Sequence, residues 1–183
     1  MLVQQTYHSP LGDMLLLGDE HALRGVWFKG QKYFMAGIDE PAVCASCDVL
    51  RQTAAWLDAY FAGKRPDPSA LSLDPHGTPF QRRIWAMLLQ IPYGQITTYG
   101  RLAEEAAQRM KRERMSAQAV GSAVGHNPIS IIIPCHRVVG MNGSLTGYAG
   151  GIERKVQLLT LEGAFMERMP VPTKGTALRR RLQ

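Results

Sequence analysis

Cys135 is the residue of this sequence best placed for covalent chemistry, because a histidine and an arginine follow it directly. It lies in Ile131-Ile132-Ile133-Pro134-Cys135-His136-Arg137-Val138-Val139. A lone cysteine is most often a small buried hydrophobe. Neighbouring cationic or basic groups, however, favour the thiolate, which is the nucleophilic form. In an extended strand the side chains of Cys135 and His136 would point to opposite faces. We therefore expect a turn at Pro134, or a water that joins the two groups.

A longer stretch around Cys135 carries a more specific pattern. Residues 127–138 read Asn-Pro-Ile-Ser-Ile-Ile-Ile-Pro-Cys-His-Arg-Val. This stretch resembles the active-site motif of the O6-alkylguanine-DNA alkyltransferases, the methylated-DNA–protein-cysteine methyltransferases. The resemblance is dense over residues 77–163 and looser over residues 1–76, where it depends on strand pattern and on Ser9-Pro10-Leu11-Gly12. Further similar segments are Gly77–Gln81, Ile91–Gly94, Ala119–Gly121, Gly147–Gly151 and Leu161–Gly163.

The resemblance implies a role for each residue of the motif. Cys135 would accept the alkyl group from guanine O6, and His136 would act as its base through a water. Glu162 would orient His136. Asn127 would connect the DNA-binding helix to the active-site turn, and Tyr99 would donate a proton to the leaving guanine.

The resemblance also implies a base pocket and a DNA-binding surface. The backbone of Val138 and Cys135 would read the edge of the base, and a loop containing Tyr148, Ala149 and Gly150 would cover it. The expected DNA contacts are Tyr99, Lys111, Arg112, Arg114, Ser116, Ala117, Gln118 and Arg137.

The reaction implied is single-turnover repair of DNA. An O6-alkylguanine, and by extension an O4-alkylthymine, must leave the base stack to reach a protein thiolate. The product is a thioether that nothing in the sequence could hydrolyse, so each molecule would be consumed. We expect no cofactor and no metal, and duplex DNA carrying the lesion as the partner of a monomer.

Gln118 departs from the family pattern, which has an arginine just before Ala-Val-Gly on the recognition helix. Glutamine is shorter and uncharged, so we expect weaker DNA binding or a changed preference for the opposing base. The spacing from Tyr99 to Gln118 is also long for the family. The extra residues lie near 110–115, a basic segment that either contacts phosphates or is a solvated loop.

The elements that position these residues fall into two halves. The first reads as strands at residues 2–7, 14–17 and 23–28, then a helix with Leu50, Ala54, Leu57 and Phe61 at helical spacing and Gly63 at its end. This predicts an α+β half with an antiparallel sheet, which the resemblance identifies as ribonuclease-H-like.

The second half reads as helices with clear starting signals. Thr78, Pro79 and Gln81 form a capping box with proline at the first helical position. Thr98 and Ser116 are the expected caps of the next two helices, which form a helix-turn-helix pair, winged by resemblance. A last helix covers residues 153–162. We predict an N-terminal domain over 1–76, a DNA-binding and acceptor domain over 77–169, and a basic tail over 170–183.

Charge follows the same division. The whole chain of 183 residues has a net charge of +6 and is 45% hydrophobic, which excludes a disordered or collagen-like chain. Residues 1–76 hold 6 basic and 9 acidic residues, whereas residues 77–183 hold 15 and 6. A basic half indicates a polyanionic partner or a solvated face. No signal peptide and no apolar run long enough to span a membrane is evident, and cysteines are sparse, so we expect a cytoplasmic protein.

Cys44 and Cys47 form a CxxC pair in the first half. A zinc or redox site is one interpretation, with His8, His21 or His76 as further ligands. Helical spacing with one buried sulfur is the favoured one.

Three other functions compete with alkyl transfer. A related binding protein that flips damaged bases without repairing them would lack the acceptor cysteine. A thiol hydrolase using Cys135, His136 and Glu162 would leave the helix pair and the basic half unexplained. A DNA-binding regulator would leave the surroundings of Cys135 without a purpose.

Overall fold

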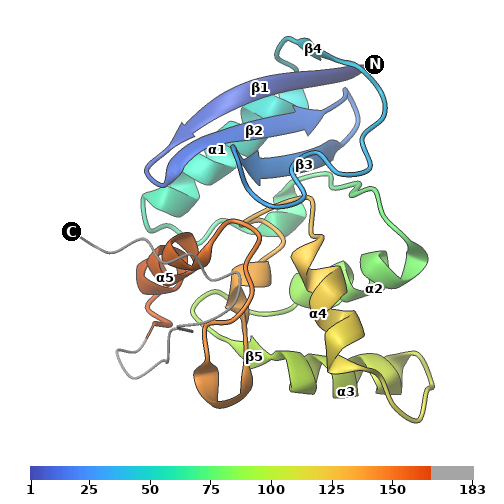
Figure 1. Ribbon diagram of the computed structural model, residues 1–183. Coiled ribbons are helices and arrows are strands. Elements are labelled where there is room, and N and C mark those ends of the chain that lie inside the picture. The colour runs from blue at the N-terminus through green and yellow to red at the C-terminus, as the bar shows by residue number, and fades with distance from the viewer. Residues whose placement is uncertain (166–183) are drawn as a thin grey trace.

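The computed structural model describes residues 1–165, so the predicted basic tail at 170–183 lies outside the described residues. A sheet with one helix forms one end of the molecule, and four further α-helices form the other (Figure 1). None of the helices in the described part of the chain is long and apolar enough to cross a membrane.

The sheet of the N-terminal half contains four strands in the order β3-β2-β1-β4. Their bounds are β1 Leu2–Ser9, β2 Gly12–Gly18, β3 Leu23–Phe28 and β4 Ala42–Cys44. β1, β2 and β3 pair antiparallel, as predicted. β4 was not predicted, and it pairs parallel to β1, so the sheet is mixed rather than purely antiparallel.

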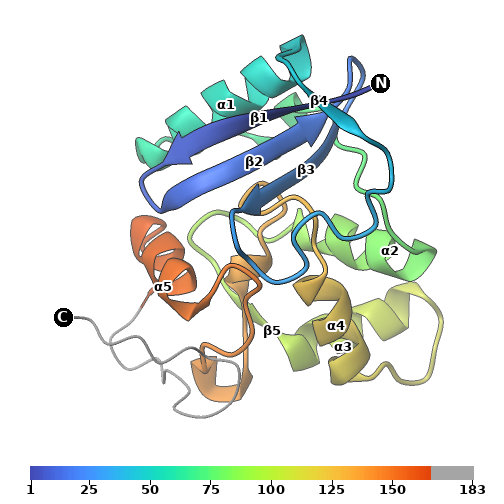
Figure 2. The same ribbon diagram turned by 45° about the horizontal axis from the view of Figure 1, so that its top comes forward.

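Successive strand residues point to opposite sides of this sheet, and apolar side chains on both sides are buried, so both faces are covered. Figure 2 shows α1 (Asp48–Phe61) across one face, where Val3, Leu16 and Val26 join the main core. The other face carries a separate cluster that includes Leu15 and Trp27 and is covered by the segment leading to β4. The helix predicted from Leu50 and Leu57 is confirmed.

Of the four helices of the C-terminal half, the first three begin where their caps predict, whereas the last has no side-chain cap. They are α2 Pro79–Leu88, α3 Tyr99–Arg109, α4 Ala117–Gly125 and α5 Ile152–Leu161. Thr78 and Gln81 form the expected capping box, and the Thr98 and Ser116 side chains each accept a hydrogen bond from the backbone N–H three residues further on, of Arg101 and Ala119. A two-stranded parallel ladder joins β5 (Thr97–Thr98) to β6 (Val138–Val139). Short 3-10 turns cover Pro68–Ala70, Cys135–Arg137 and Met141–Gly143.

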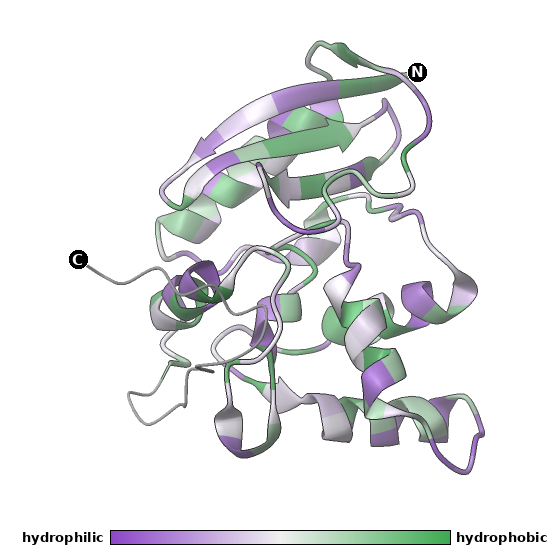
Figure 3. Cartoon of the chain, in the orientation of Figure 1, coloured by the Kyte–Doolittle hydropathy of each residue, from purple (hydrophilic) through white to green (hydrophobic). Residues whose placement is uncertain are grey.

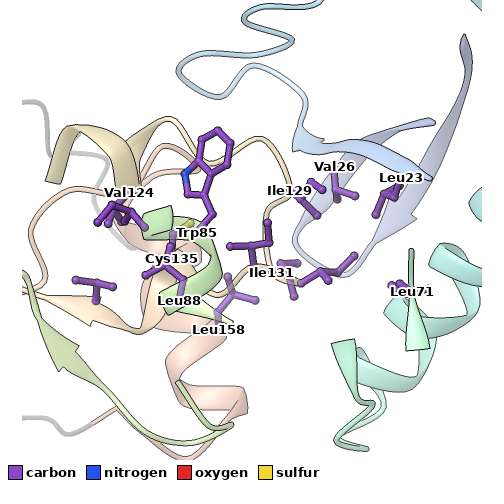
Figure 4. Packing of buried hydrophobic residues seen from close by; sticks show 14 of the residues in the cluster. Leu23, Val26, Leu71, Trp85, Leu88, Val124, Ile129, Ile131, Cys135 and Leu158 are labelled. Carbon is purple, nitrogen blue, oxygen red and sulfur yellow. The ribbon is translucent and has the colours of Figure 1, made fainter. Parts of the chain in front are cut away.

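The two halves share one hydrophobic core. Val26 of β3 donates its N–H to the Pro128 carbonyl and accepts a hydrogen bond from the Ser130 N–H. Figure 4 shows Leu23 and Val26 of the sheet in the same buried cluster as Trp85 and Cys135. The sheet edge is therefore attached directly to the segment that leads to Cys135.

The interpretation of the CxxC pair as helical is wrong. Cys44 ends β4 and is exposed, whereas Cys47 is the N-cap of α1 and is half-buried, so only the second of the two cysteines adjoins a helix. Within residues 1–165 no cluster of three or more histidine, cysteine or acidic side chains has a geometry suited to a metal.

Candidate functional site

Cys135 lies in a 3-10 turn, Cys135–Arg137, which supplies the chain reversal expected after Pro134. Its side chain is buried, with 5% of its surface exposed. The Nδ2 group of Asn127, just beyond the end of α4, donates hydrogen bonds to the Cys135 Sγ at 3.2 Å and to the Ile133 carbonyl at 2.8 Å. Asn127 also accepts a hydrogen bond from the Ile129 N–H. The predicted connection from helix to turn is thus present.

The surroundings of Cys135 hold its sulfur in the neutral form. Burial raises the pKa of the Cys135 thiol, because a thiolate loses its hydration there. The hydrogen bond from Asn127 and the charge of Lys155 lower that pKa again, but by less. A base must therefore take the proton as the sulfur reacts.

Glu162 anchors the histidine that could act as this base. Its Oε1 lies 2.7 Å from the Nε2 of His136, and both side chains are fully buried. The hydrogen bonds from His136 and Arg137 hold the pKa of Glu162 far below its ordinary range despite its burial. A carboxylate can only accept, so the proton of neutral His136 is on Nε2.

This tautomer leaves the second ring nitrogen of His136 as the free base. Nδ1 is buried and has no hydrogen-bond partner among the described residues. Burial lowers the pKa of His136, and the charges of Arg137 and Lys155 lower it further, against the opposing effect of Glu162. His136 is therefore neutral and able to accept a proton at neutral pH.

The structure places Arg137 in the buried site and not on the surface where a DNA contact was expected. Its side chain is buried against Glu162, with Nε at 2.8 Å from Oε2 and Nη2 at 3.0 Å from Oε1. A third donor, Nη1, reaches the Ile91 carbonyl at 2.6 Å. A guanidinium that binds a buried carboxylate through two nitrogens cannot at the same time reach a phosphate outside.

Lys155 of α5 is a site residue that the sequence analysis missed. Its side chain is fully buried, and its Nζ donates to the carbonyls of Val138 at 2.5 Å, Thr146 at 3.0 Å and Gly147 at 3.2 Å. Burial lowers the pKa of Lys155 to about 8. Its position three residues before the buried Leu158 was the available signal, since this places it on the core face of the helix.

Tyr99 opens α3 beside the same loop. Its hydroxyl donates to the carbonyls of Thr146 at 3.2 Å and Gly147 at 3.0 Å. Burial and the nearby Cys135 raise its pKa, so it remains a neutral donor. Tyr99 and Lys155 together therefore fix the start of the predicted base-covering loop.

The rest of that loop is attached to the N-terminal half. The Ala149 carbonyl accepts a hydrogen bond from the Lys32 N–H at 3.1 Å, and the Gly150 carbonyl accepts one at 3.0 Å from Arg154 of α5, whose Nε donates to the Leu11 carbonyl of the N-terminal half. The Tyr148 hydroxyl is buried without a hydrogen-bond partner among the described residues. Val138 directly follows the Cys135–Arg137 turn, and burial and the charge of Cys135 raise the pKa of Tyr148, so both residues lie near Cys135.

The predicted DNA-contacting residues other than Tyr99 and Arg137 lie on the surface, away from this buried cluster. Ser116, Ala117 and Gln118, at and after the start of α4, are exposed. Lys111, Arg112 and Arg114, in the turn between α3 and α4, are exposed as well. Figure 3 shows this turn as a strongly hydrophilic end of the helix pair.

Comparison with known proteins agrees with this geometry. Residues 2–75 match the family model of the 6-O-methylguanine DNA methyltransferase ribonuclease-like domain, and residues 79–164 match that of the DNA-binding domain of the same family. The chain belongs to this family. The resemblance first seen in the motif around Cys135 thus extends through both halves of this methyltransferase.

Individual relatives cover nearly the whole chain. The methylated-DNA–protein-cysteine methyltransferase of Methanosarcina acetivorans is 42% identical over 160 residues, which are 86% of this chain and 96% of the relative. That of Haemophilus influenzae is 39% identical over 93% of this chain and 88% of its own. The crystal structure of Mycobacterium tuberculosis OGT in complex with DNA matches with a TM-score of 0.75 and 39% identity, covering 91% of this chain and 94% of that one.

Proposed function

We propose that this methyltransferase repairs O6-alkylguanine in duplex DNA by transferring the alkyl group to Cys135. Family membership gives the reaction class, DNA repair by alkyl transfer from DNA to a protein cysteine. The observation that assigns it to Cys135 is the arrangement of its neighbours. The sulfur accepts a hydrogen bond from Asn127, and the next residue, His136, is held by Glu162 with a free ring nitrogen.

The proposed step is a displacement at the alkyl carbon. The Cys135 sulfur attacks this carbon, a C–S bond forms, and the bond from carbon to guanine O6 breaks with its electron pair on the guanine. His136 Nδ1 accepts the thiol proton through a water, and the imidazolium is stabilised by Glu162. Tyr99 donates a proton to the leaving guanine and so neutralises its developing charge.

Access of the lesion to Cys135 requires base flipping in this proposal, because the sulfur is buried and a stacked base cannot reach it. The start of α4, with Ser116, Ala117 and Gln118, would lie against the duplex, and the basic turn at 111–114 would contact phosphates. The loop at 148–150 would close over the flipped base. An O4-alkylthymine presents an equivalent alkyl carbon and is proposed as a second substrate.

The rest of the proposal concerns the state in which the protein works. We infer a cytoplasmic monomer that needs no cofactor and that binds lesion-bearing duplex DNA. Two domains meeting near residue 77 are supported by the limits of the two family matches, at residues 75 and 79. Because the thioether is stable, each molecule acts once.

Intact-mass measurement tests this proposal. The protein is incubated with an excess of duplex containing one O6-methylguanine, and with the same duplex containing guanine. We expect a gain of one methyl group on the protein with the lesion only, located at Cys135 by peptide mapping. Cys135→Ser, which keeps the size and polarity of the side chain, should gain nothing. An unmodified wild-type protein would refute the function, and a methyl group on Cys44 or Cys47 would refute the assignment to Cys135.

A further inference from the structure

Tyr60 of α1 contacts the catalytic carboxylate from the other half of the molecule. Its hydroxyl donates to the Glu162 Oε1 at 2.7 Å, across 102 residues of sequence. Tyr60 is 1% exposed, so water does not compete for this bond. The acceptor is the same oxygen that binds the Nε2 of His136, also at 2.7 Å.

Packing alone does not account for the hydroxyl of Tyr60. The ring stacks on Trp56 with centroids 5.7 Å apart, and it meets Phe61 and Tyr93 edge-on at 5.4 and 6.1 Å. A phenylalanine ring would make the same contacts. A buried hydroxyl is costly unless it is paired, and its partner here is Glu162.

The Glu162 Oε1 accepts three hydrogen bonds, from Tyr60, His136 and the Nη2 of Arg137. Each donor withdraws negative charge from the carboxylate. With less charge left on Oε1, the carboxylate attracts the imidazolium form of His136 less strongly. The Tyr60 hydroxyl therefore favours the neutral histidine that a base requires.

We propose that Tyr60 is a positioning residue of the alkyl-transfer site. It acts through Glu162 to keep His136 neutral, with Nδ1 free to accept the proton of the Cys135 thiol. This inference rests on the proposed function for its catalytic meaning, but the state of His136 can be measured without DNA. It also assigns the N-terminal half a part in the chemistry, in addition to its structural one.

The charged and titratable groups around this contact are known. His136 and Arg137 face Glu162 from the active-site turn, Tyr93 from the segment after α2, and Cys135, Tyr148 and Lys155 lie around the same cluster. Burial and the charge of Glu162 raise the pKa of Tyr60. Tyr60 therefore stays a donor at every pH at which the protein is used, and His136 is the group that titrates.

The test is a titration of His136 by NMR in the free protein, with 15N-labelled histidine, in wild type and Tyr60→Phe. We expect the wild-type imidazole to carry its proton on Nε2. In Tyr60→Phe the midpoint for protonation should rise, corresponding to a roughly three- to tenfold higher proton affinity, because only part of the energy of one hydrogen bond to a charged group differs between the two protonation states of His136. The midpoint of the acid limb in the pH profile of the alkyl-transfer rate should move to higher pH by the same amount, with the alkaline plateau within about twofold of wild type.

Tyr93→Phe is the matched control, because it removes a hydroxyl from the same cluster that donates to the Leu161 carbonyl at 3.2 Å and not to Glu162. It should leave the His136 titration in place. A second measurement uses 3-fluorotyrosine at all six tyrosines, since a fluorinated phenol is a stronger donor. The midpoint should then fall in wild type but stay unchanged in Tyr60→Phe.

An unchanged His136 midpoint in Tyr60→Phe, with only a lower melting temperature, would show a purely structural tyrosine and overturn the inference. If Tyr60→Phe does not fold, the fluorotyrosine protein decides, and an unmoved midpoint there overturns it equally. Failure of the wild type to gain a methyl group from DNA would instead refute the proposed function, with the titration unaffected.

Discussion

At the scale of single residues, one buried carboxylate organises the site. Glu162 binds His136, Arg137 and Tyr60, and its Oε2 also accepts the Gly94 N–H at 3.3 Å. Burial then shifts two neighbouring groups in opposite directions, raising the pKa of Cys135 and lowering that of His136. Cys135 and His136 are therefore both uncharged in the resting protein. In the proposed reaction the proton leaves the thiol as the sulfur attacks the alkyl carbon.

This pairing predicts the pH dependence of alkyl transfer. Between the lowered pKa of His136 and the raised pKa of Cys135 neither group changes its charge, so the wild-type rate should be flat near pH 7 and should next change where Lys155 titrates, at about 8. In His136→Ala the thiol must ionise without a base. We expect the rate at pH 7 to fall by about 10²–10⁴-fold.

The slope of the His136→Ala profile separates the alternatives. Single-turnover rates on O6-methylguanine duplex should rise about tenfold per pH unit up to pH 9, following the thiolate fraction, because the pKa of the buried thiol lies above that range. A flat profile in His136→Ala would mean that another group accepts the proton. Lys155, whose pKa burial lowers to about 8, would then be the group to replace next.

At the scale of elements, the sequence predicts structure that depends on residues close together in the chain, but not contacts between residues far apart. The starts of α2, α3 and α4 follow from Thr78, Thr98 and Ser116, because a capping hydrogen bond involves residues at most three apart. The direction of Arg137 depends on Glu162, which lies 25 residues away, and the sequence contains no trace of that pairing.

The remaining errors have the same origin. The pairing of β4 with β1 joins residues about 40 positions apart, and its three residues are too few to show a strand period. Tyr60 lies on a predicted helix, yet its partner Glu162 is visible only once both halves are folded together. The motif at 127–138 was informative because Asn127 and Cys135, which form a hydrogen bond, lie only eight residues apart.

The first turn of α4 gives a prediction at this scale. Gln118 is exposed beside the N-cap Ser116, so Gln118→Arg adds a cation where we expect DNA. Binding should become tighter, and the slope of log affinity against log salt should steepen by about one unit for one new phosphate contact. The cost to the helix from a cation at its N-terminus is a few tenths of a kcal/mol, which is smaller than this gain.

Fluorescence anisotropy with a labelled lesion duplex at several salt concentrations measures this slope. Gln157→Arg on the exposed side of α5 adds the same charge elsewhere, and it serves as the control for net charge alone. Equal slopes for the two variants would place the DNA somewhere other than at the start of α4.

At the scale of the whole molecule, the two halves differ in charge and are joined by contacts near Cys135 and Glu162. The N-terminal half is acidic overall and the C-terminal half basic, yet β3 pairs with the segment before Cys135 and Tyr60 reaches Glu162. Arg154 adds a third connection, because its Nε donates to the Leu11 carbonyl at 3.0 Å and its Nη1 to the Gly150 carbonyl at 3.0 Å. Its guanidinium also lies over the Phe28 ring, 4.4 Å from the centroid.

A continuous core with such connections predicts one cooperative unfolding transition. Trp27 in the sheet and Trp85 on α2 are each 1% exposed. In two variants that keep only one of them, with the other two tryptophans replaced by phenylalanine, tryptophan fluorescence reports on one half at a time. Their urea midpoints should coincide. Arg154→Met removes two hydrogen bonds but keeps an apolar stem over Phe28, so it should destabilise by about 1–3 kcal/mol, or roughly 2–12 °C in melting temperature. Arg154→Lys, which keeps the charge, should lose less. In Arg154→Met the urea midpoints from Trp27 and Trp85 should shift together, because the loop held by Arg154 unfolds in the same transition as the sheet.

A shift of the Trp85 midpoint alone would mean that the two halves unfold independently.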